Sequence, residues 1–400
     1  MSGFGRGHVR GLLGPYGEGF RAKLLSSGYS WGSATHQVHL MAHFSRWLEA
    51  NELSLARVDR SVVTKFLEAR RSEGYVKLLS DRAMAPMIEY LHDLGVMPPE
   101  APQPMTPGEV LLGEFGQYLF DERGLAKDSV RSYVGVARQF LACTGSGDHP
   151  DLQGLSAASV AGFVRDECAR RGVGSASATV TGTRAWLRFL HATGRTPMPL
   201  APAVPSVANW SLASLPRSIS SRELACLLRS CDRRRLGGRR DFAILVLCSR
   251  LGLRAGEVAG LQLGDIDWRQ GELVVRGKAA RRDRLPLPAD VGEAIAAWLT
   301  RGRPKGIDTP AVFVRLRAPH GPLASTGVSA VVRRASVRTG LEPIGAHRLR
   351  HTAATTMLQA GANLAEIGQV LRHERLLTTA VYAKVDLSAL ATVAQPWPQP

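Results

Sequence analysis

The side chains best suited to chemistry on a phosphate ester lie in the last two fifths of the chain. Arg254 and Arg350 each carry a planar guanidinium, which can donate paired hydrogen bonds to the non-bridging oxygens of a phosphodiester. Tyr382 is the only tyrosine after Tyr133, so it is the one phenol of this part that could serve as a nucleophile. Because a phenol has a pKa of about 10, it needs a neighbouring base or strong charge stabilisation to react at neutral pH.

Three further residues could move protons in such a reaction. His347 and His373 are the candidates for helping the phenol lose its proton. Lys278 could protonate the leaving oxygen if nearby positive charge lowers its pKa. The arginines flanking this lysine are Arg276, Arg281 and Arg282.

The elements expected to position these residues are mostly helices with one small antiparallel sheet. Ser220 or Ser221 can cap a helix that has Glu223 in its first turn, and a buried helix follows at DFAILVLCSRLG. The segments GELVVRGK and RLPLP, joined by a polar turn, predict a hairpin with Lys278 at its tip. Further helices are predicted around SAVVRRASVRTG, HRLRHTAATTMLQAG and NLAEIGQVLRH.

Proline-rich stretches at 97–107 and 197–216 are predicted linkers that divide the chain into three pieces. The first two pieces resemble each other, because the pattern LHxxG followed by proline recurs at an offset of 99 residues. Each copy is expected to be a bundle of about four amphipathic helices. The expected domains are two helical DNA-binding domains at 1–102 and 108–200, a catalytic domain at 217–386 and a tail at 387–400.

The charge of the chain favours a polyanionic partner. Lys and Arg number 51 against 34 Asp and Glu, a net charge of +17. Residues 217–350 hold 26 basic and 12 acidic residues, so +14 of this excess lies in one third of the chain. A local basic footprint indicates nucleic acid more than general solubility. Besides the three hairpin arginines, the residues expected to contact DNA form the run Arg233, Arg234, Arg235, Arg239 and Arg240.

Four segments carry a resemblance to a known family. In chain order they are LGLRAGEVAGL, VRGKAARRDRLPL, GAHRLRHTAATTML and VLRHERLLTTAVYAKV. Together they resemble the tyrosine recombinase family, also called the phage-integrase family, over about residues 217–386. A single HxxR pair has little weight in an arginine-rich chain, so the order and context of all four segments make the likeness specific.

This resemblance implies a set of site residues. They are Arg254, Lys278, His347, Arg350, His373 and, as the nucleophile, Tyr382. Glu257 matches the acidic residue that supports the site in the family, and His351 is expected to be structural. The family commonly has LGH where this chain has LRH, so Arg372 is expected either to add a phosphate contact or to change the local turn.

The resemblance also implies a function. It is that of a site-specific recombinase that cuts and rejoins DNA through a 3′-phosphotyrosyl intermediate, and the extra helical repeat favours an integrase or transposase of a mobile element. Double-stranded DNA would be bound by a homodimer on one site and by a homotetramer in the synaptic complex, with accessory proteins of the same element as further candidates. Two alternatives stay open, namely a type IB topoisomerase-like enzyme and a non-catalytic DNA-binding protein of the same fold.

No cofactor or metal ion is expected, because a phosphotyrosyl bond keeps the energy of the broken phosphodiester. The five cysteines form no CxxC pair, which indicates a reducing compartment. No apolar run reaches the roughly 18 to 20 residues that span a bilayer, so no membrane association is expected. The expected location is the bacterial cytoplasm, in association with the nucleoid.

Overall fold

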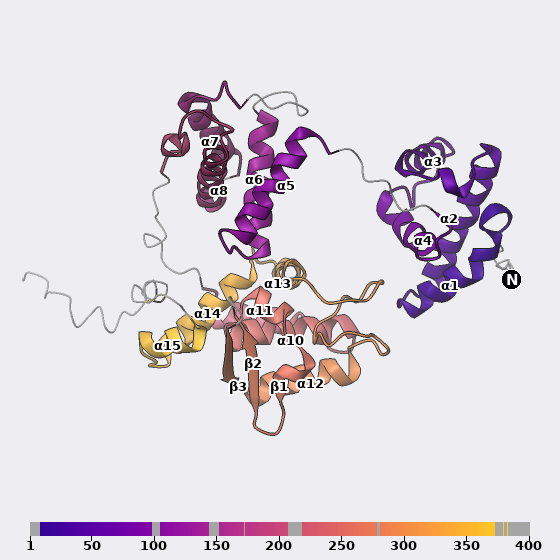
Figure 1. Cartoon of the computed structure of the whole chain (residues 1–400). Coiled ribbons are helices and arrows are strands. Elements are labelled where there is room, and N and C mark those ends of the chain that lie inside the picture. The colour runs from indigo at the N-terminus through magenta and orange to yellow at the C-terminus, as the bar shows by residue number, and fades with distance from the viewer. Residues whose placement is uncertain are drawn as a thin grey trace, which may run out of the picture. The chain divides into compact units, whose positions relative to one another are not determined.

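The computed structural model of the chain describes residues 9–97, 105–143, 152–171, 173–206, 218–277 and 281–372, with Thr379 and Tyr382 (Figure 1). Glu100–Ser211 form a compact unit of their own. The residues before and after this unit contain two further hydrophobic cores, one in each part. None of the described helices is long and apolar enough to cross a membrane.

The first region, 9–97, is a bundle of helices around one core. Ser30 and Asp59 begin two of these helices by accepting hydrogen bonds from backbone N–H groups, the usual contact of an N-cap. Apolar residues at spacings of three and four face inward, and the rings of Phe44 and Phe66 meet with 4.8 Å between centroids. The elements are η1 (Gly11–Tyr16), α1 (Gly17–Ser26), α2 (Trp31–Ala50), η2 (Leu55–Arg57), α3 (Arg60–Ser72) and α4 (Asp81–Asp93).

The second region, 105–206, is a bundle of the same kind. Thr106 and Glu109 form a reciprocal capping box, with Pro107 in the first turn where its missing N–H does no harm. Trp186 packs in the core, with 4.9 Å between its ring centroid and that of Phe115. The elements are α5 (Pro107–Asp121), α6 (Lys127–Cys143), α7 (Ala157–Arg171), α8 (Val173–Ala192) and η3 (Ala201–Ala203).

The two bundles end in the same way, as the repeat predicts. Gly95 and Gly194 both have φ 68°, a left-handed conformation that favours glycine. Each glycine donates its N–H to the carbonyl of the histidine three residues earlier, His92 or His191, and the next residue donates to the carbonyl five positions back. Each described bundle has four α-helices, in agreement with the number expected.

The second proline-rich stretch differs from the expectation at its beginning. Leu200 and Val204 are only 5% and 2% exposed and belong to the core of the second bundle. Arg184 donates a hydrogen bond of 3.0 Å to the carbonyl of Val204. Prolines lack backbone donors, so such a stretch can pack without leaving buried N–H groups unpaired. The packed part of this bundle therefore extends to residue 204.

The third region, 218–372, is mostly helical with a three-stranded antiparallel sheet, which confirms the predicted fold class. α10 runs through its core, with an unbroken buried stretch from Ala243 to Ser249, and it packs against α12, α13 and α14. The helices are α9 (Ser221–Arg229), α10 (Leu236–Arg250), α11 (Ala255–Ala259), α12 (Ala289–Arg301), α13 (Ser325–Arg338), α14 (Ala346–Gln359) and α15 (Leu364–Leu371). The predicted cap of α9 is confirmed, because Ser220 and Glu223 form a capping box.

The sheet contains the predicted hairpin and one further strand. β2 (Glu272–Arg276) pairs with β3 (Arg282–Pro286) from Glu272 opposite Pro286 to Arg276 opposite Arg282. β3 thus begins two residues before the predicted segment RLPLP. The short β1 (Ile266–Asp267), which follows η5 (Leu263–Asp265), pairs with β2 and was not predicted.

Candidate active site

The turn after α10 aims Arg254 at the site. Gly252 has φ 59°, and a Cβ at this position would lie 2.4 Å from the Leu371 side chain, so the turn requires glycine. Two residues later, Arg254 stands immediately before α11 with 44% of its side chain exposed. This arginine is therefore anchored by its backbone and still accessible to a ligand.

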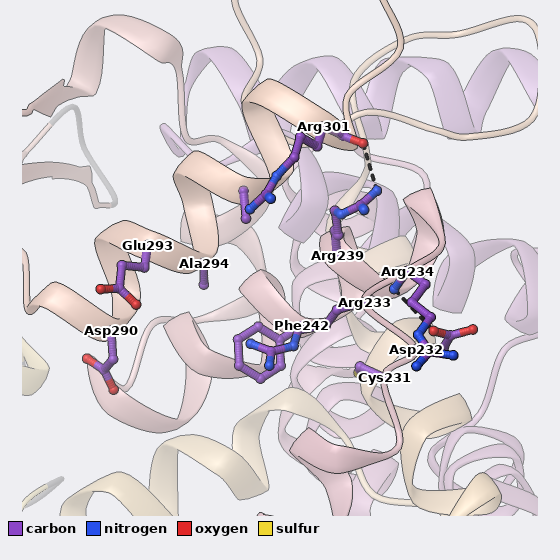
Figure 2. A pocket seen from close by; sticks show the side chains of 11 residues that line it. Cys231, Asp232, Arg233, Arg234, Arg239, Phe242, Asp290, Glu293, Ala294 and Arg301 are labelled. Carbon is purple, nitrogen blue, oxygen red and sulfur yellow. Dashed lines mark hydrogen bonds between the residues drawn. The ribbon is translucent and has the colours of Figure 1, made fainter.

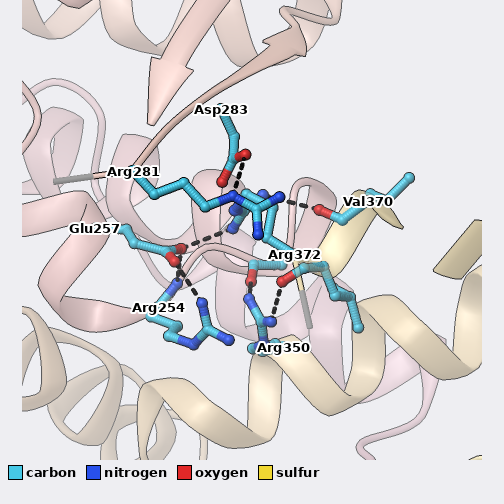
Figure 3. A network of polar contacts seen from close by, with 9 residues as sticks. Arg254, Glu257, Arg281, Asp283, Arg350, Val370 and Arg372 are labelled. Atoms are coloured by element: carbon cyan, nitrogen blue, oxygen red, sulfur yellow. Dashed lines mark hydrogen bonds and ion pairs between the residues drawn. The ribbon is translucent and has the colours of Figure 1, made fainter. Parts of the chain in front are cut away.

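Glu257 holds Arg254 in place. Its side chain is only 5% exposed, and one oxygen accepts a hydrogen bond of 2.7 Å from the Arg254 guanidinium. The other oxygen accepts the backbone N–H of Arg254 at 2.8 Å and the guanidinium of Arg372 at 2.7 Å (Figure 3). A buried carboxylate is tolerated only when its lone pairs are used in this way.

Arg350, on α14, is almost completely buried at 1% exposure. Its guanidinium donates to the carbonyl of Gly252 at 2.6 Å and to the carbonyl of Leu371. Burial and then the charge of Arg254 lower its pKa to about 10, so it remains a cation at neutral pH. Arg350 thereby ties the turn before Arg254 to the end of α15.

Arg372 ends α15 in a left-handed conformation, with φ 58° and ψ 50°. This is the turn that a glycine would adopt there, so the arginine has not changed the backbone. Its side chain is 4% exposed and points inward to Glu257, with a second bond of 2.8 Å to the carbonyl of Val370. The expected phosphate contact of Arg372 does not fit this buried position.

Tyr382 lies in a small apolar cluster with Ala354 of α14 and with Ile367 and Leu371 of α15. The residue is 1% exposed, and burial raises the pKa of its phenol to about 12, while Arg350 acts in the opposite direction. The phenol is therefore neutral in this state. Arg350 donates to the carbonyl of Leu371, which belongs to the same apolar cluster as Tyr382, so the predicted nucleophile and one predicted arginine lie at the same site.

The phenol oxygen of Tyr382 lies 2.7 Å from Nδ1 of His351, a contact that the sequence analysis missed. His347, one helical turn earlier, packs edge-on against His351 with 4.5 Å between ring centroids. Desolvation, followed by the charges of Arg350 and Arg254, lowers the pKa of His347. The signal for His351 was its spacing, because i and i+4 lie on one helix face.

Two predicted site residues, Lys278 and His373, lie outside the described residues. Their immediate surroundings are described in part. The N–H of Gly277 donates 2.8 Å to the carbonyl of Arg281, which continues the hairpin toward its tip. The C-terminal end of α15, immediately before His373, is held by Arg350 and by Glu257 through Arg372. The roles of both residues stay predictions.

Part of the predicted arginine run lines a cavity of about 690 Å³ (Figure 2). Arg233 stacks over the Phe242 ring at 4.7 Å, and Arg239 donates 2.8 Å to the carbonyl of Arg301. The lining also includes carboxylates, namely Asp232, Asp290 and Glu293. The cavity is therefore mixed in charge. Arg234 and Arg235 are exposed.

Arg240 does not fit the expected contact with DNA. The residue is 7% exposed, and its guanidinium donates hydrogen bonds of 2.9 Å to Asp241 and of 3.3 Å to the carbonyl of Val314. It is a packing residue of α10, and the assignment is corrected accordingly.

The three hairpin arginines differ in how far they are engaged. Arg276 is bonded to Asp265 at 2.8 Å, and Arg281 is bonded to Asp283 at 2.8 Å. Arg282 is exposed. All three keep solvent-exposed surface, Arg276 and Arg282 in the strands and Arg281 immediately before β3, and they stay predicted DNA contacts.

Comparison with known proteins places this chain in a family. The model of the phage integrase family matches residues 217–388. A putative integrase/recombinase, y4rA of Sinorhizobium fredii, is 39% identical over 95% of this chain and 93% of its own length. A tyrosine recombinase XerC of a Mycobacterium species is 30% identical over 71% of this chain and 97% of its own length.

Solved structures show the same fold at low sequence identity. XerH site-specific recombinase bound to its difH substrate has a TM-score of 0.54 at 16% identity, covering 83% of this chain and 94% of that chain. A lambda integrase (75–356) dimer bound to a COC′ core site has a TM-score of 0.52 at 17% identity, covering 73% and 98%. The solved structures agree in fold, and the relative that is 39% identical over 95% of this chain establishes that the chain belongs to the phage integrase family, the tyrosine recombinases.

Proposed function

We propose that this protein is a site-specific DNA recombinase that cuts and rejoins DNA through a covalent bond between Tyr382 and a 3′ phosphate. One observation carries the proposal. Arg254, Arg350 and Tyr382, which are far apart in sequence, converge on one site in a chain that belongs to the tyrosine recombinases. Cleavage and rejoining of DNA is the reaction of that family.

In the proposed reaction, the phenol oxygen of Tyr382 attacks phosphorus and the bond to the 5′ oxygen breaks. Arg254 and Arg350 would donate to the non-bridging oxygens, where negative charge grows in the transition state. Lys278 would give the 5′ oxygen its proton. His347 and His373 would be the remaining catalytic residues. A free 5′ hydroxyl of another strand can then attack the phosphotyrosine, so strands are exchanged without an external energy source.

The partners proposed for the chain follow its relatives. Solved neighbours include a lambda integrase dimer bound to a core site and a lambda integrase tetramer bound to a Holliday junction. We propose the same for this protein, with a homodimer on one site and a homotetramer at synapsis, on the nucleoid of a bacterial cell. The two helical domains, 1–102 and 108–200, would bind DNA together with the catalytic domain, 217–386, and the tail 387–400 would serve contacts between protomers.

The biological setting proposed is a mobile element. y4rA, which matches this chain over nearly its whole length, is described as a putative integrase/recombinase. Integration, excision or transposition by such an element, assisted by accessory proteins, would use the same chemistry at Tyr382.

The decisive experiment detects the covalent intermediate. DNA sites are first selected from random duplexes by binding to the Tyr382→Phe variant, which keeps the fold and lacks only the nucleophilic oxygen. Selected duplexes carrying a nick near the cleavage point are then incubated with either protein, and SDS-resistant adducts are measured. An adduct with wild type that is absent from Tyr382→Phe supports the proposal. Selected DNA that is bound without any adduct refutes it and favours a non-catalytic DNA-binding protein.

A further inference from the structure

The contact between His351 and Tyr382 has no counterpart among the site residues expected from the family resemblance. His351 lies on α14, immediately after Arg350, and its Nδ1 atom is 2.7 Å from the phenol oxygen. The two ring centroids are 5.6 Å apart. A distance of 2.7 Å is that of a good O–H···N hydrogen bond, and it joins His351 to the very atom that would react.

We propose that His351 is the base that accepts the proton of Tyr382 when the phenol oxygen attacks the scissile phosphate. This inference rests on the proposed function. The O–H bond of Tyr382 breaks and an N–H bond forms at Nδ1 of His351, while the oxygen forms its bond to phosphorus. The bond from phosphorus to the 5′ oxygen breaks, and that oxygen takes a proton from the general acid, proposed to be Lys278. On rejoining, His351 returns its proton to the leaving phenolate.

In the site without DNA, both partners of this hydrogen bond, His351 and Tyr382, are uncharged. Burial, then His347, then Arg350 lower the pKa of His351 to about 4, so its imidazole is neutral at pH 7 and Nδ1 is able to accept. Burial raises the pKa of Tyr382 to about 12, so the phenol keeps its proton. Without DNA, the proton stays on the oxygen and the site is unreactive.

Substrate changes this balance in the required direction. A phosphate held by Arg254 and Arg350 brings negative charge next to Arg350, the cation that disfavours an imidazolium at His351. The basicity of His351 therefore rises when the scissile phosphate is in place. Because Tyr382 is 1% exposed, the side chains around its oxygen must move to admit that phosphate. The pair of His351 and Tyr382 keeps its contact in the proposed step.

His347, a base candidate from the sequence, is placed differently. The ring contact that the structure records for it is with His351, and Arg350 and Arg254 both act on its charge. His351 thus stands between His347 and the phenol. His347 is therefore proposed to act on the phosphate together with the arginines, whereas the contact with the phenol oxygen belongs to His351.

The test separates proton acceptance from simple packing. His351→Asn puts an amide oxygen close to the position of Nδ1, so it keeps a hydrogen-bond acceptor that cannot take the proton. We measure single-turnover adduct formation on the selected nicked DNA with tyrosine at 382, and again with a fluorinated tyrosine whose phenol ionises near neutral pH. With tyrosine, His351→Asn should slow the reaction by about 100-fold, a typical contribution of a general base. With the fluorinated phenol, the loss should fall to less than about 5-fold.

His347→Asn is the matched control, one helical turn away on the same face. It should slow both phenols by the same factor, because its role does not involve the phenol proton. Normal rates for His351→Asn, or an equal loss with both phenols, would overturn the inference. If His351→Asn fails to fold, the two phenols are compared in His351→Gln instead, after normal DNA binding of this variant has been verified. Failure of the proposed function would look different, because the wild-type protein would then form no adduct with the selected DNA.

Discussion

Replacing Arg372 tests whether its buried ion pair stabilises the protein by more than its left-handed backbone conformation destabilises it. Arginine is unusual at φ 58°, where a side chain contacts its own backbone, and this conformation costs about 1 kcal/mol relative to glycine. The same residue forms an ion pair of 2.7 Å with Glu257, with both side chains no more than 5% exposed. Arg372→Gly removes strain and ion pair together, whereas Arg372→Ala removes the ion pair and keeps the strain.

The expected magnitudes follow from these two contributions. Breaking a buried pair by removing one partner costs about 3 to 5 kcal/mol. Glu257 keeps Arg254 and one backbone N–H as donors, which favours the low end, about 3 kcal/mol. Relief of the backbone strain offsets about 1 kcal/mol of this in the glycine variant. We therefore expect local stability to fall by about 2 kcal/mol in Arg372→Gly and by about 3 kcal/mol in Arg372→Ala.

Native-state hydrogen exchange, measured on peptides of α14 and α15 at increasing urea, reads this local stability without assuming that the whole chain unfolds in one step. Glu257→Gln, alone and combined with Arg372→Gly, completes a double-mutant cycle for the pair. A coupling energy near zero would refute the account of the ion pair. Greater stability of Arg372→Ala than of Arg372→Gly would refute the account of the strain.

Three further substitutions test the proposed catalytic roles. Arg254→Ala should slow cleavage by on the order of 100-fold with a smaller effect on DNA binding, because the charge that it meets is greatest in the transition state; near-normal cleavage would contradict its assignment. Arg350→Ala should show the same loss together with reduced stability, since the carbonyls of Gly252 and Leu371 would lose a buried donor. Lys278→Ala should recover most of its activity on DNA with a 5′-bridging sulfur, whose leaving group needs no proton, and persistent inactivity on that substrate would argue against a general acid.

Local sequence signals predicted the parts of the fold that depend on neighbours in the chain. The cap at Ser220 and Glu223 and the buried α10 need only residues three or four apart, and both were predicted. β1 was missed because a strand of two residues has no alternation to detect. The burial of Leu200 and Val204 was missed because prolines nearby indicate a linker whether or not the apolar residues pack.

At the site too, contacts between residues close in sequence can be anticipated, whereas contacts between distant residues cannot. Glu257 was expected from the family resemblance to support the site, and its contact with Arg254 needs only three residues of chain at the start of α11. The burial of Arg240 could not be predicted from the arginine run, because Arg239 and Arg240 are neighbours of the same type. They differ only in their partners: Arg239 donates to the carbonyl of Arg301, and Arg240 donates to Asp241 and to the carbonyl of Val314. Arg372 turned inward for the same reason: its partner is 115 residues away in the chain.

In the proposed reaction, the charges gathered at the site would favour the transition state over the bound phosphodiester. Arg254, Arg350 and Arg372 are three cations around a single carboxylate, Glu257, which leaves an excess of two positive charges. A phosphodiester carries one negative charge, so the bound substrate neutralises only part of this excess. When the oxygen of Tyr382 attacks and its proton stays on the protein, the five-coordinate phosphorus group carries two. The protein's fixed charges would thus match the proposed transition state better than the substrate, and such a difference is what accelerates a reaction. Arg372 contributes to it from the interior, without touching the DNA.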